Sequence, residues 1–132
     1  MNLLLDTHTF VWWVEKNPKL STEQVTRLQE VERKGDKFNI SIITLWEIAR
    51  LVSLGRLEIS TSIDHWFDQL EEDSRLSILP LSGSIVLESM RLGRNFPKDP
   101  ADQLIAATAR IHGLKLMTVD QEIIKSGVVA IA

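Results

Sequence analysis

Two apolar segments that each end on an aspartate constrain the fold of this chain most strongly. Leu3-Leu4-Leu5 is followed by Asp6 near the start, and Leu114–Val119 is followed by Asp120 near the end. A short apolar run without alternation is typical of a strand that is buried on both faces, as in a parallel sheet. Ligand sites of such sheets lie beyond the carboxyl ends of the strands. We therefore expect both aspartates at one rim of a parallel sheet.

The rest of the chain alternates between strand and helix patterns. Ser21 and Gln24 match a capping box, and the helix that they open ends at Gly35. Strands separated by helices imply right-handed crossovers, and hence an α/β fold with a parallel sheet flanked by helices. The further strands are expected at Phe38–Ser41, Leu76–Leu81 and Val128–Ile131, and the further helices after Asp6, at Ile42–Leu54 as a buried helix, after Ser62, at Ser84–Leu92 and at Ala101–Ile111.

Length and composition exclude several classes of protein. A chain of 132 residues predicts one domain, residues 1–132, and 44% hydrophobic with 25% charged residues is typical of a globular domain. The absence of cysteine excludes disulfides, thiolate zinc sites and thiol nucleophiles, and it fits the cytoplasm. No apolar run approaches the roughly 20 residues of a membrane helix. The net charge of −3 predicts that any contact with nucleic acid is local.

Carboxylates at helix starts have two interpretations. Asp6 and Asp120 each precede a helical segment and fit a helix cap, but their shared rim favours a site. Asp99 precedes Pro100, the expected first residue of a helix, so capping alone would explain it. Asp102 in the same turn adds repulsion that a cap does not require, although the helix dipole favours a negative charge there.

Glu47 lies in an apolar stripe of its expected helix, with Ile43 and Leu51 one turn away on either side. An unpaired buried carboxylate costs several kcal/mol, so Glu47 needs a cation or a proton. An ion pair with Arg50 is one solution, and a bound metal ion is the other. Oxygen ligands without thiolates suit Mg²⁺ or Mn²⁺, which activate water for phosphodiester hydrolysis. The candidate metal ligands are Asp6, Glu47, Asp99, Asp102 and Asp120, and all of these except Asp99 are candidate catalytic residues.

Other side chains are weaker candidates. Thr7 and Thr118 lie next to rim aspartates and are candidate substrate contacts, although strand propensity alone explains Thr118. His8 is close enough to Asp6 in sequence to approach the metal ion, but a single histidine on a tryptophan-rich helix more often has a packing or surface role. The candidate phosphate contacts, which also fit a solvated face, are Arg91, Arg94 and Lys98. The chain has four tryptophans, which is more than a small core readily encloses. We therefore expect Trp12, Trp13 and Trp46 to lie partly on a surface that contacts another chain.

Four segments together resemble the PIN-domain nucleases, and among them the VapC toxins of bacterial toxin-antitoxin modules. They are Leu4–His8, Ser41–Ile48, Asp99–Ala109 and Leu116–Asp120. The resemblance implies a three-layer α/β/α fold with a short central parallel sheet, cleavage of RNA with Mg²⁺ or Mn²⁺, a homodimer, and a cognate antitoxin whose C-terminal segment covers the acidic groove. It assigns the four family acids to Asp6, Glu47, Asp102 and Asp120, with Asp99 as an auxiliary acid.

One position departs from the family pattern. Relatives often carry arginine where this chain has Gln103, so local phosphate contacts or antitoxin pairing are expected to differ. Two alternatives share the fold. A PIN-like nuclease of RNA processing or repair would keep the acids without an antitoxin, and a catalytically silent interaction module would keep only the fold. The intact acid set disfavours the silent module.

Overall fold

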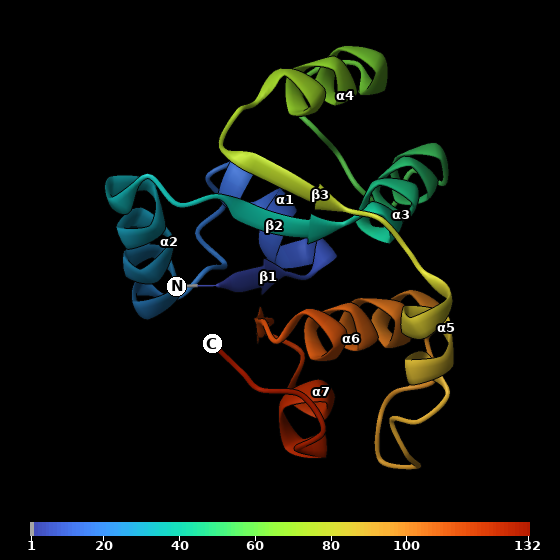
Figure 1. The fold of residues 1–132 in the computed structure, drawn as a ribbon. Helices are drawn as coiled ribbons and strands as arrows, with labels where there is room; N and C mark the ends of the chain where they lie inside the picture. The colour runs from blue at the N-terminus through green and yellow to red at the C-terminus, as the bar shows by residue number, and fades with distance from the viewer. Residues whose placement is uncertain (1) are drawn as a thin grey trace.

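A four-stranded parallel sheet forms the centre of the molecule. The computed structural model describes residues 2–132. Its strands are β1 (Leu3–Leu5), β2 (Phe38–Ser41), β3 (Leu76–Leu79) and β4 (Lys115–Met117), in the order β3-β2-β1-β4 (Figure 1). All three strand pairs are parallel, and Leu4 lies opposite Asn39 on one side and Leu116 on the other. The predicted α/β class with a parallel sheet is therefore confirmed.

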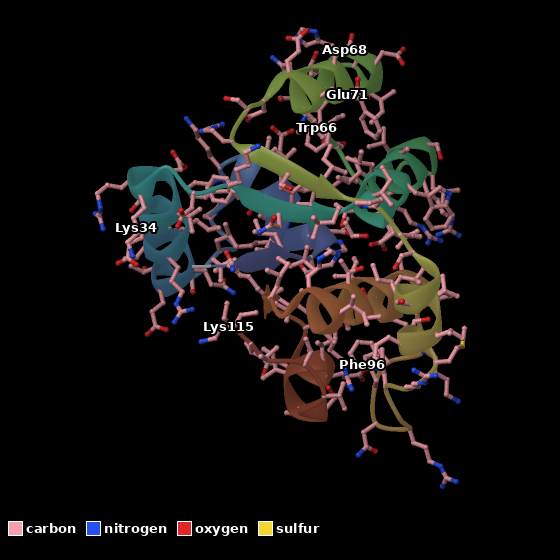
Figure 2. The ribbon with its side chains drawn as sticks, viewed as in Figure 1. Lys34, Trp66, Asp68, Glu71, Phe96 and Lys115 are labelled. Carbon is pink, nitrogen blue, oxygen red and sulfur yellow. The ribbon has the colours of Figure 1, made fainter. Side chains whose placement is uncertain are left out.

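Helices cover both faces of this sheet, because the strands are apolar on both faces. Leu3 and Leu5 belong to a core cluster with Phe10 and Trp66, whereas Leu4 belongs to a second cluster with Ile105. This alternation follows from the two-residue period of a strand and gives the predicted three layers. Figure 2 shows Trp66 beneath α4. The helices are α1 (Thr7–Val14), α2 (Thr22–Lys34), α3 (Ile42–Ser53), α4 (Ile63–Glu72), α5 (Gly83–Ser89), α6 (Pro100–His112) and α7 (Gln121–Ser126).

Local signals placed several helix ends correctly. The Ser21 hydroxyl accepts from the backbone N–H of Gln24, and the Gln24 side chain accepts from the Ser21 N–H, which completes the capping box. Helix α6 begins with Asp99 as its cap and Pro100 as its first residue. None of the helices formed by residues 2–132 combines the length and the hydropathy required to cross a lipid bilayer.

Three predictions about elements were wrong in part. Helix α3 is not buried all round: it buries Ile48 but leaves Ile42 41% and Trp46 56% exposed, since no layer of the described chain covers that side. Helix α5 ends at Ser89 rather than at Leu92, because Leu92 turns into the second core cluster. The expected strand Val128–Ile131 forms only one isolated bridge, between Ile131 and Leu116.

Candidate metal centre

Asp6 is positioned by the end of β1 and the start of α1. Its side chain is 8% exposed, and it caps α1 by accepting from the Thr9 N–H at 2.9 Å. Its second oxygen accepts a hydrogen bond of 2.5 Å from the Thr118 hydroxyl. The two interpretations of Asp6 are thus compatible, because one oxygen serves the cap and the other lies at the rim.

Asp120 lies at the same rim as Asp6. Leu5 pairs with Met117 in the sheet, so the residues that follow β1 and β4 leave it together. The Asp120 N–H donates to the Thr118 hydroxyl at 3.1 Å, and the Asp120 carboxylate caps α7 by accepting from the Glu122 N–H at 2.9 Å. One threonine hydroxyl therefore connects the side chain of Asp6 with the backbone of Asp120.

Glu47 reaches the rim from the second turn of α3. The Thr7 hydroxyl donates to its carboxylate, and the hydroxyl oxygens of Thr7 and Thr44 lie 3.3 Å apart. Burial raises the pKa of Glu47, the bond from Thr7 opposes this rise, and the negative charges of Asp99 and Asp6 add to it. Arg50 does not pair with Glu47, because its guanidinium lies 5.7 Å from the centre of the Trp46 ring.

The two acids at the start of α6 have different environments. Asp99 caps the helix by accepting from the N–H groups of Ala101 at 2.8 Å and Asp102 at 3.2 Å. Asp102 is half-buried, and its pKa is raised to about 7, first by burial and then by the charge of Asp99. Smaller contributions come from the negative charges of Glu47, Asp6 and Asp120. The other four predicted ligands therefore all lie within electrostatic range of Asp102.

This cluster matches the chemistry of a hard divalent cation. All of its donors are carboxylate oxygens, and within residues 2–132 no ion pair neutralises any of the five acids. In the described part of the chain, no three acidic or histidine side chains lie close enough together to hold a metal ion as they stand. The observation that supports a cation is electrostatic, because the half-buried Asp102 carries a pKa near neutrality among four further carboxylates.

The two threonines beside these acids, Thr7 and Thr118, form hydrogen bonds with the acids themselves. Thr7 and Thr118 are each 3% exposed, and each hydroxyl hydrogen-bonds a carboxylate. This geometry favours a role in orienting the carboxylates of Glu47 and Asp6, rather than the predicted role of contacting the substrate. His8 is exposed and lies 5.8 Å from the ring of Trp12, and its charge acts on Glu47 to lower the pKa of that acid.

The predicted basic residues do not form one group. Arg91 lies 4.0 Å from Glu88, one turn back on the chain, and the Glu88 carboxylate also lies 2.8 Å from Arg110. Arg94 and Lys98 instead line a shallow depression together with Lys125. Gln103, which departs from the family pattern, donates its side-chain N–H to the Pro97 carbonyl at 3.2 Å and so holds the segment before α6.

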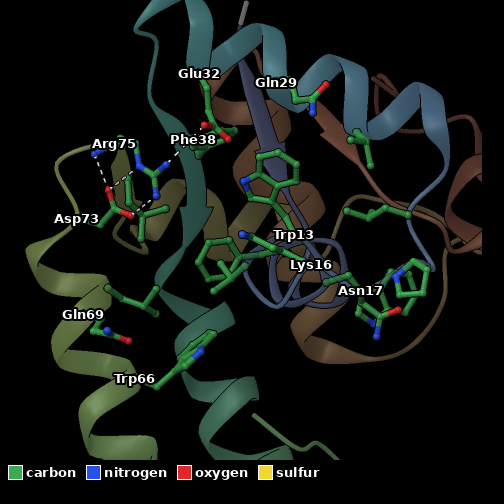
Figure 3. A pocket seen from close by; sticks show the side chains of 18 residues that line it. Trp13, Lys16, Asn17, Gln29, Glu32, Phe38, Trp66, Gln69, Asp73 and Arg75 are labelled. Atoms are coloured by element: carbon green, nitrogen blue, oxygen red, sulfur yellow. Dashed lines mark hydrogen bonds and ion pairs between the residues drawn. The ribbon is translucent and has the colours of Figure 1, made fainter. Parts of the chain in front are cut away.

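A cavity of about 830 Å³ lies at the opposite end of the sheet from the acids. Phe38 and Leu76, which begin β2 and β3, line it together with Trp12 and Trp13 of α1 (Figure 3). Arg75 closes one side, with a nitrogen 2.9 Å from Asp73 and another 3.6 Å from Glu32. Sequence patterns did not reveal this cavity, because its walls come from separate helices and strands.

The tryptophans divide between core and surface. Trp66 is 2% exposed and packs edge-on to Phe10. Trp12 and Trp13 are half-buried at the cavity, and Trp46 is more than half exposed on α3. The three tryptophans that were expected near the surface are therefore the ones that the described chain leaves accessible.

Comparison with known proteins places this chain beside a group of nucleases. A sequence model of the PIN domain matches residues 3–127. "Ribonuclease VapC22" of Mycobacterium tuberculosis is 32% identical over 121 residues, which are 92% of this chain and 88% of that protein. The solved VapBC2 of Rickettsia felis, bound to a promoter DNA fragment, superposes with a TM-score of 0.73 at 22% identity over 100% of this chain and 98% of its counterpart. A toxin-antitoxin complex from Klebsiella pneumoniae superposes with a TM-score of 0.61 at 22% identity, covering 92% and 88%.

Proposed function

This chain belongs to the PIN domain family, and we propose that it is a metal-dependent endoribonuclease that acts as the toxin of a bacterial toxin-antitoxin pair. The observation that carries this proposal is the gathering of carboxylates at the carboxyl end of a parallel sheet, where burial and the neighbouring negative charges raise the pKa of Asp102. The negative charges of such a site are not balanced by positive side chains within residues 2–132, and a bound divalent cation would balance them. The relative named as a ribonuclease supports the substrate class.

Asp6, Glu47, Asp102 and Asp120 would hold Mg²⁺ or Mn²⁺, with Asp99 as an auxiliary ligand. When bound, such an ion lowers the pKa of a coordinated water and stabilises negative charge on the phosphate and on the leaving oxygen. The chain itself orients the carboxylates. Thr7 and Thr118 hold one oxygen each of Glu47 and Asp6, and the cap at Asp99 fixes the start of α6 from which Asp102 projects.

Asp102 also carries a proton in part of the metal-free molecules. With a pKa of about 7, its carboxyl group is partly protonated at neutral pH in the absence of a cation. Binding of a divalent cation favours the carboxylate and releases that proton. The affinity for metal is therefore expected to rise with pH until Asp102 is fully ionised.

Two protein partners are part of the proposal. A cognate antitoxin is supported by the similarity to the Klebsiella complex and by the accessible Trp12 and Trp13 at a cavity. A homodimer is supported by apolar side chains exposed on α3 and α5, which lie on the same side of the molecule (Figure 1). They are Ile42, Trp46, Val86 and Leu87, together with Met90, which directly follows α5. We place the activity in the cytoplasm, where RNA substrates are present.

Purified protein incubated with RNA tests the enzymatic proposal. Cleavage should require Mg²⁺ or Mn²⁺, stop on addition of chelator, and fall at least about 100-fold in Asp102→Asn prepared in parallel. Cleavage that persists in chelator, or that the variant retains in full, would overturn the metal mechanism. Co-expression with the product of the gene immediately upstream tests the toxin assignment, because an antitoxin should suppress cleavage. Active enzyme that this product leaves unaffected would instead fit a nuclease of RNA processing.

A further inference from the structure

An open depression of about 560 Å³ lies between the segment before α6 and helix α7. The two segments are distant in sequence, and the fold brings their basic side chains to one place. Its lining is Arg94, Asn95, Phe96, Pro97, Lys98, Glu122, Lys125 and Ser126. The sequence pattern indicated Arg94 and Lys98 but not Lys125, which lies 27 positions further along the chain than Lys98.

The charge of this depression is positive. Arg94, Lys98 and Lys125 are exposed, and within residues 2–132 none of the three forms an ion pair. Glu122 is the one acid of the lining, so the cations outnumber it. Arg91 differs from these cations, since Glu88 already lies beside its guanidinium. Three unpaired cations around a hollow favour an anionic ligand.

The backbone beneath these cations is fixed. Phe96 is 3% exposed and anchors the segment in the second core cluster, and Gln103 holds the carbonyl of Pro97. On the other wall, the Ser126 hydroxyl donates to the Ile123 carbonyl at 2.6 Å at the end of α7. The cationic side chains therefore project from two anchored segments, which lowers the cost of ordering them around a ligand.

The depression adjoins the candidate metal centre on both walls. Lys98 directly precedes Asp99, and the N–H of Glu122 donates to the carboxylate of Asp120. An RNA strand that enters the centre meets a carboxylate cluster on a chain of net charge −3, so its approach needs compensating cations nearby. The guanidinium and ammonium groups of this lining suit phosphate oxygens.

We propose that Arg94, Lys98 and Lys125 form a binding site for a backbone phosphate of the RNA, adjacent to the bond that is cut. This inference rests on the proposed nuclease function and assigns the phosphate contact to a set of cations that includes Lys125 and excludes Arg91. The phosphate contact would position the strand and carry no sequence information, because the phosphate is the same in every nucleotide.

Binding of a labelled single-stranded RNA, measured in chelator over a range of salt concentrations, tests the site without cleavage. The test protein carries Arg94→Gln, Lys98→Gln and Lys125→Gln. The control protein carries Arg33→Gln, Lys34→Gln and Lys115→Gln, which remove the same charges from the same residue types. All three control positions are exposed, and Lys34 and Lys115 lie on the side of the molecule away from α5 (Figure 2).

The test protein should bind RNA about 10-fold or more weakly than the parent at low salt. Its slope of log affinity against log salt should be less steep by about 0.7 for each phosphate that these cations no longer neutralise. The control should stay within about 2-fold of the parent. Glu122→Gln should bind more tightly than the parent, because it removes the one negative charge of the lining.

Equal decreases of affinity in the test and control proteins would show an effect of net charge alone and overturn the site. A parent that cuts RNA while the test protein binds RNA as tightly as the parent does would overturn this site but leave the nuclease proposal intact. A parent that neither binds nor cuts RNA would overturn both.

Discussion

The Thr118 hydroxyl donates to the carboxylate of Asp6 across 112 positions of the chain, and the same hydroxyl accepts from the N–H of Asp120. The hydrogen bond to Asp6 is shielded from solvent, because Asp6 is 8% and Thr118 3% exposed. A buried group that orients a candidate metal ligand in this way acts on the ligand rather than on the substrate. The relationship defines Thr118 as a positioning residue for Asp6.

Thr118→Val keeps the shape of the side chain and removes the hydroxyl. The variant should lose about 10- to 100-fold in metal affinity or in activity, because the Asp6 carboxylate loses its partner. Thr118→Ser should restore most of the loss, since serine retains the donor. The measurement is Mn²⁺ affinity alongside RNA cleavage, with thermal unfolding to confirm that both variants fold. A valine variant with the parent's metal affinity would contradict the positioning role.

Substitutions should distinguish the structural role of Asp99 from the catalytic role proposed for Asp102. Asp102→Asn should abolish most cleavage, whereas Asp99→Asn should keep the helix cap, because asparagine caps as well as aspartate does. Asp99→Ala should lower the free energy of unfolding by about 1 kcal/mol through loss of the bonds to the N–H groups of Ala101 and Asp102. Cleavage rates and urea unfolding of the three variants check this. Equal losses of activity in Asp99→Asn and Asp102→Asn would make both acids ligands of equal weight.

The stability of the metal-free protein should depend on the pH through Asp102. Its folded pKa of about 7 exceeds the ordinary value of 3.8, so the folded state binds more protons than the unfolded state between these two values. The free energy of unfolding should therefore fall as the pH rises from about 4 to about 7 and then level off. Because Asp102 is only half-buried, screening by solvent should reduce the loss to about 1 to 2 kcal/mol.

Thermal melts in chelator between pH 4 and pH 8 measure this effect, with Asp102→Asn as the reference. The variant should be the more stable protein at pH 8, and its advantage should shrink towards pH 4, where the parent's Asp102 is protonated as well. Parallel curves for the two proteins would show that Asp102 keeps an ordinary pKa.

Much of the fold was predictable because its signals are local. The capping box of Ser21 and Gln24, the first-turn proline of α6 and the apolar strands all act through neighbours in sequence. The exposed side of α3 was not predicted, because periodicity identifies apolar positions such as Trp46 without showing whether another layer covers them. The same limit explains the shortened strand near Ile131, where only one bridge to the sheet forms.

The carboxylates of the candidate site could be predicted from the sequence, but the contacts that orient them and the grouping of the cations beside them could not. Asp6 and Asp120 follow apolar strands, so their shared rim followed from sheet topology. The bond from Thr7 to Glu47 and the meeting of Lys125 with Lys98 depend on tertiary structure. Sequence spacing carries no signal for contacts of this kind between distant segments.

The exposed apolar side chains of α3 and α5 should support self-association. Val86 on α5 is 44% exposed, and Ile111 on α6 is 45% exposed and lies outside this group, so the two form a matched pair. Val86→Glu should weaken association about 10-fold or more by placing a charge in the interface, whereas Ile111→Glu should leave it unchanged. Sedimentation over a range of protein concentrations measures this. A parent that stays monomeric at every concentration would contradict the interface.

Direct titration of Mn²⁺ into the metal-free protein, followed by the electron paramagnetic resonance of the free ion, tests the central claim that the five carboxylates form a metal centre. The parent should bind Mn²⁺ and gain thermal stability, since a ligand that binds the folded state stabilises it. Asp102→Asn should bind at least about 10-fold more weakly, and Glu122→Gln, which removes an acid outside the proposed ligand set, should bind like the parent. Binding that is the same in all three proteins, or absent from the parent, would contradict the metal centre.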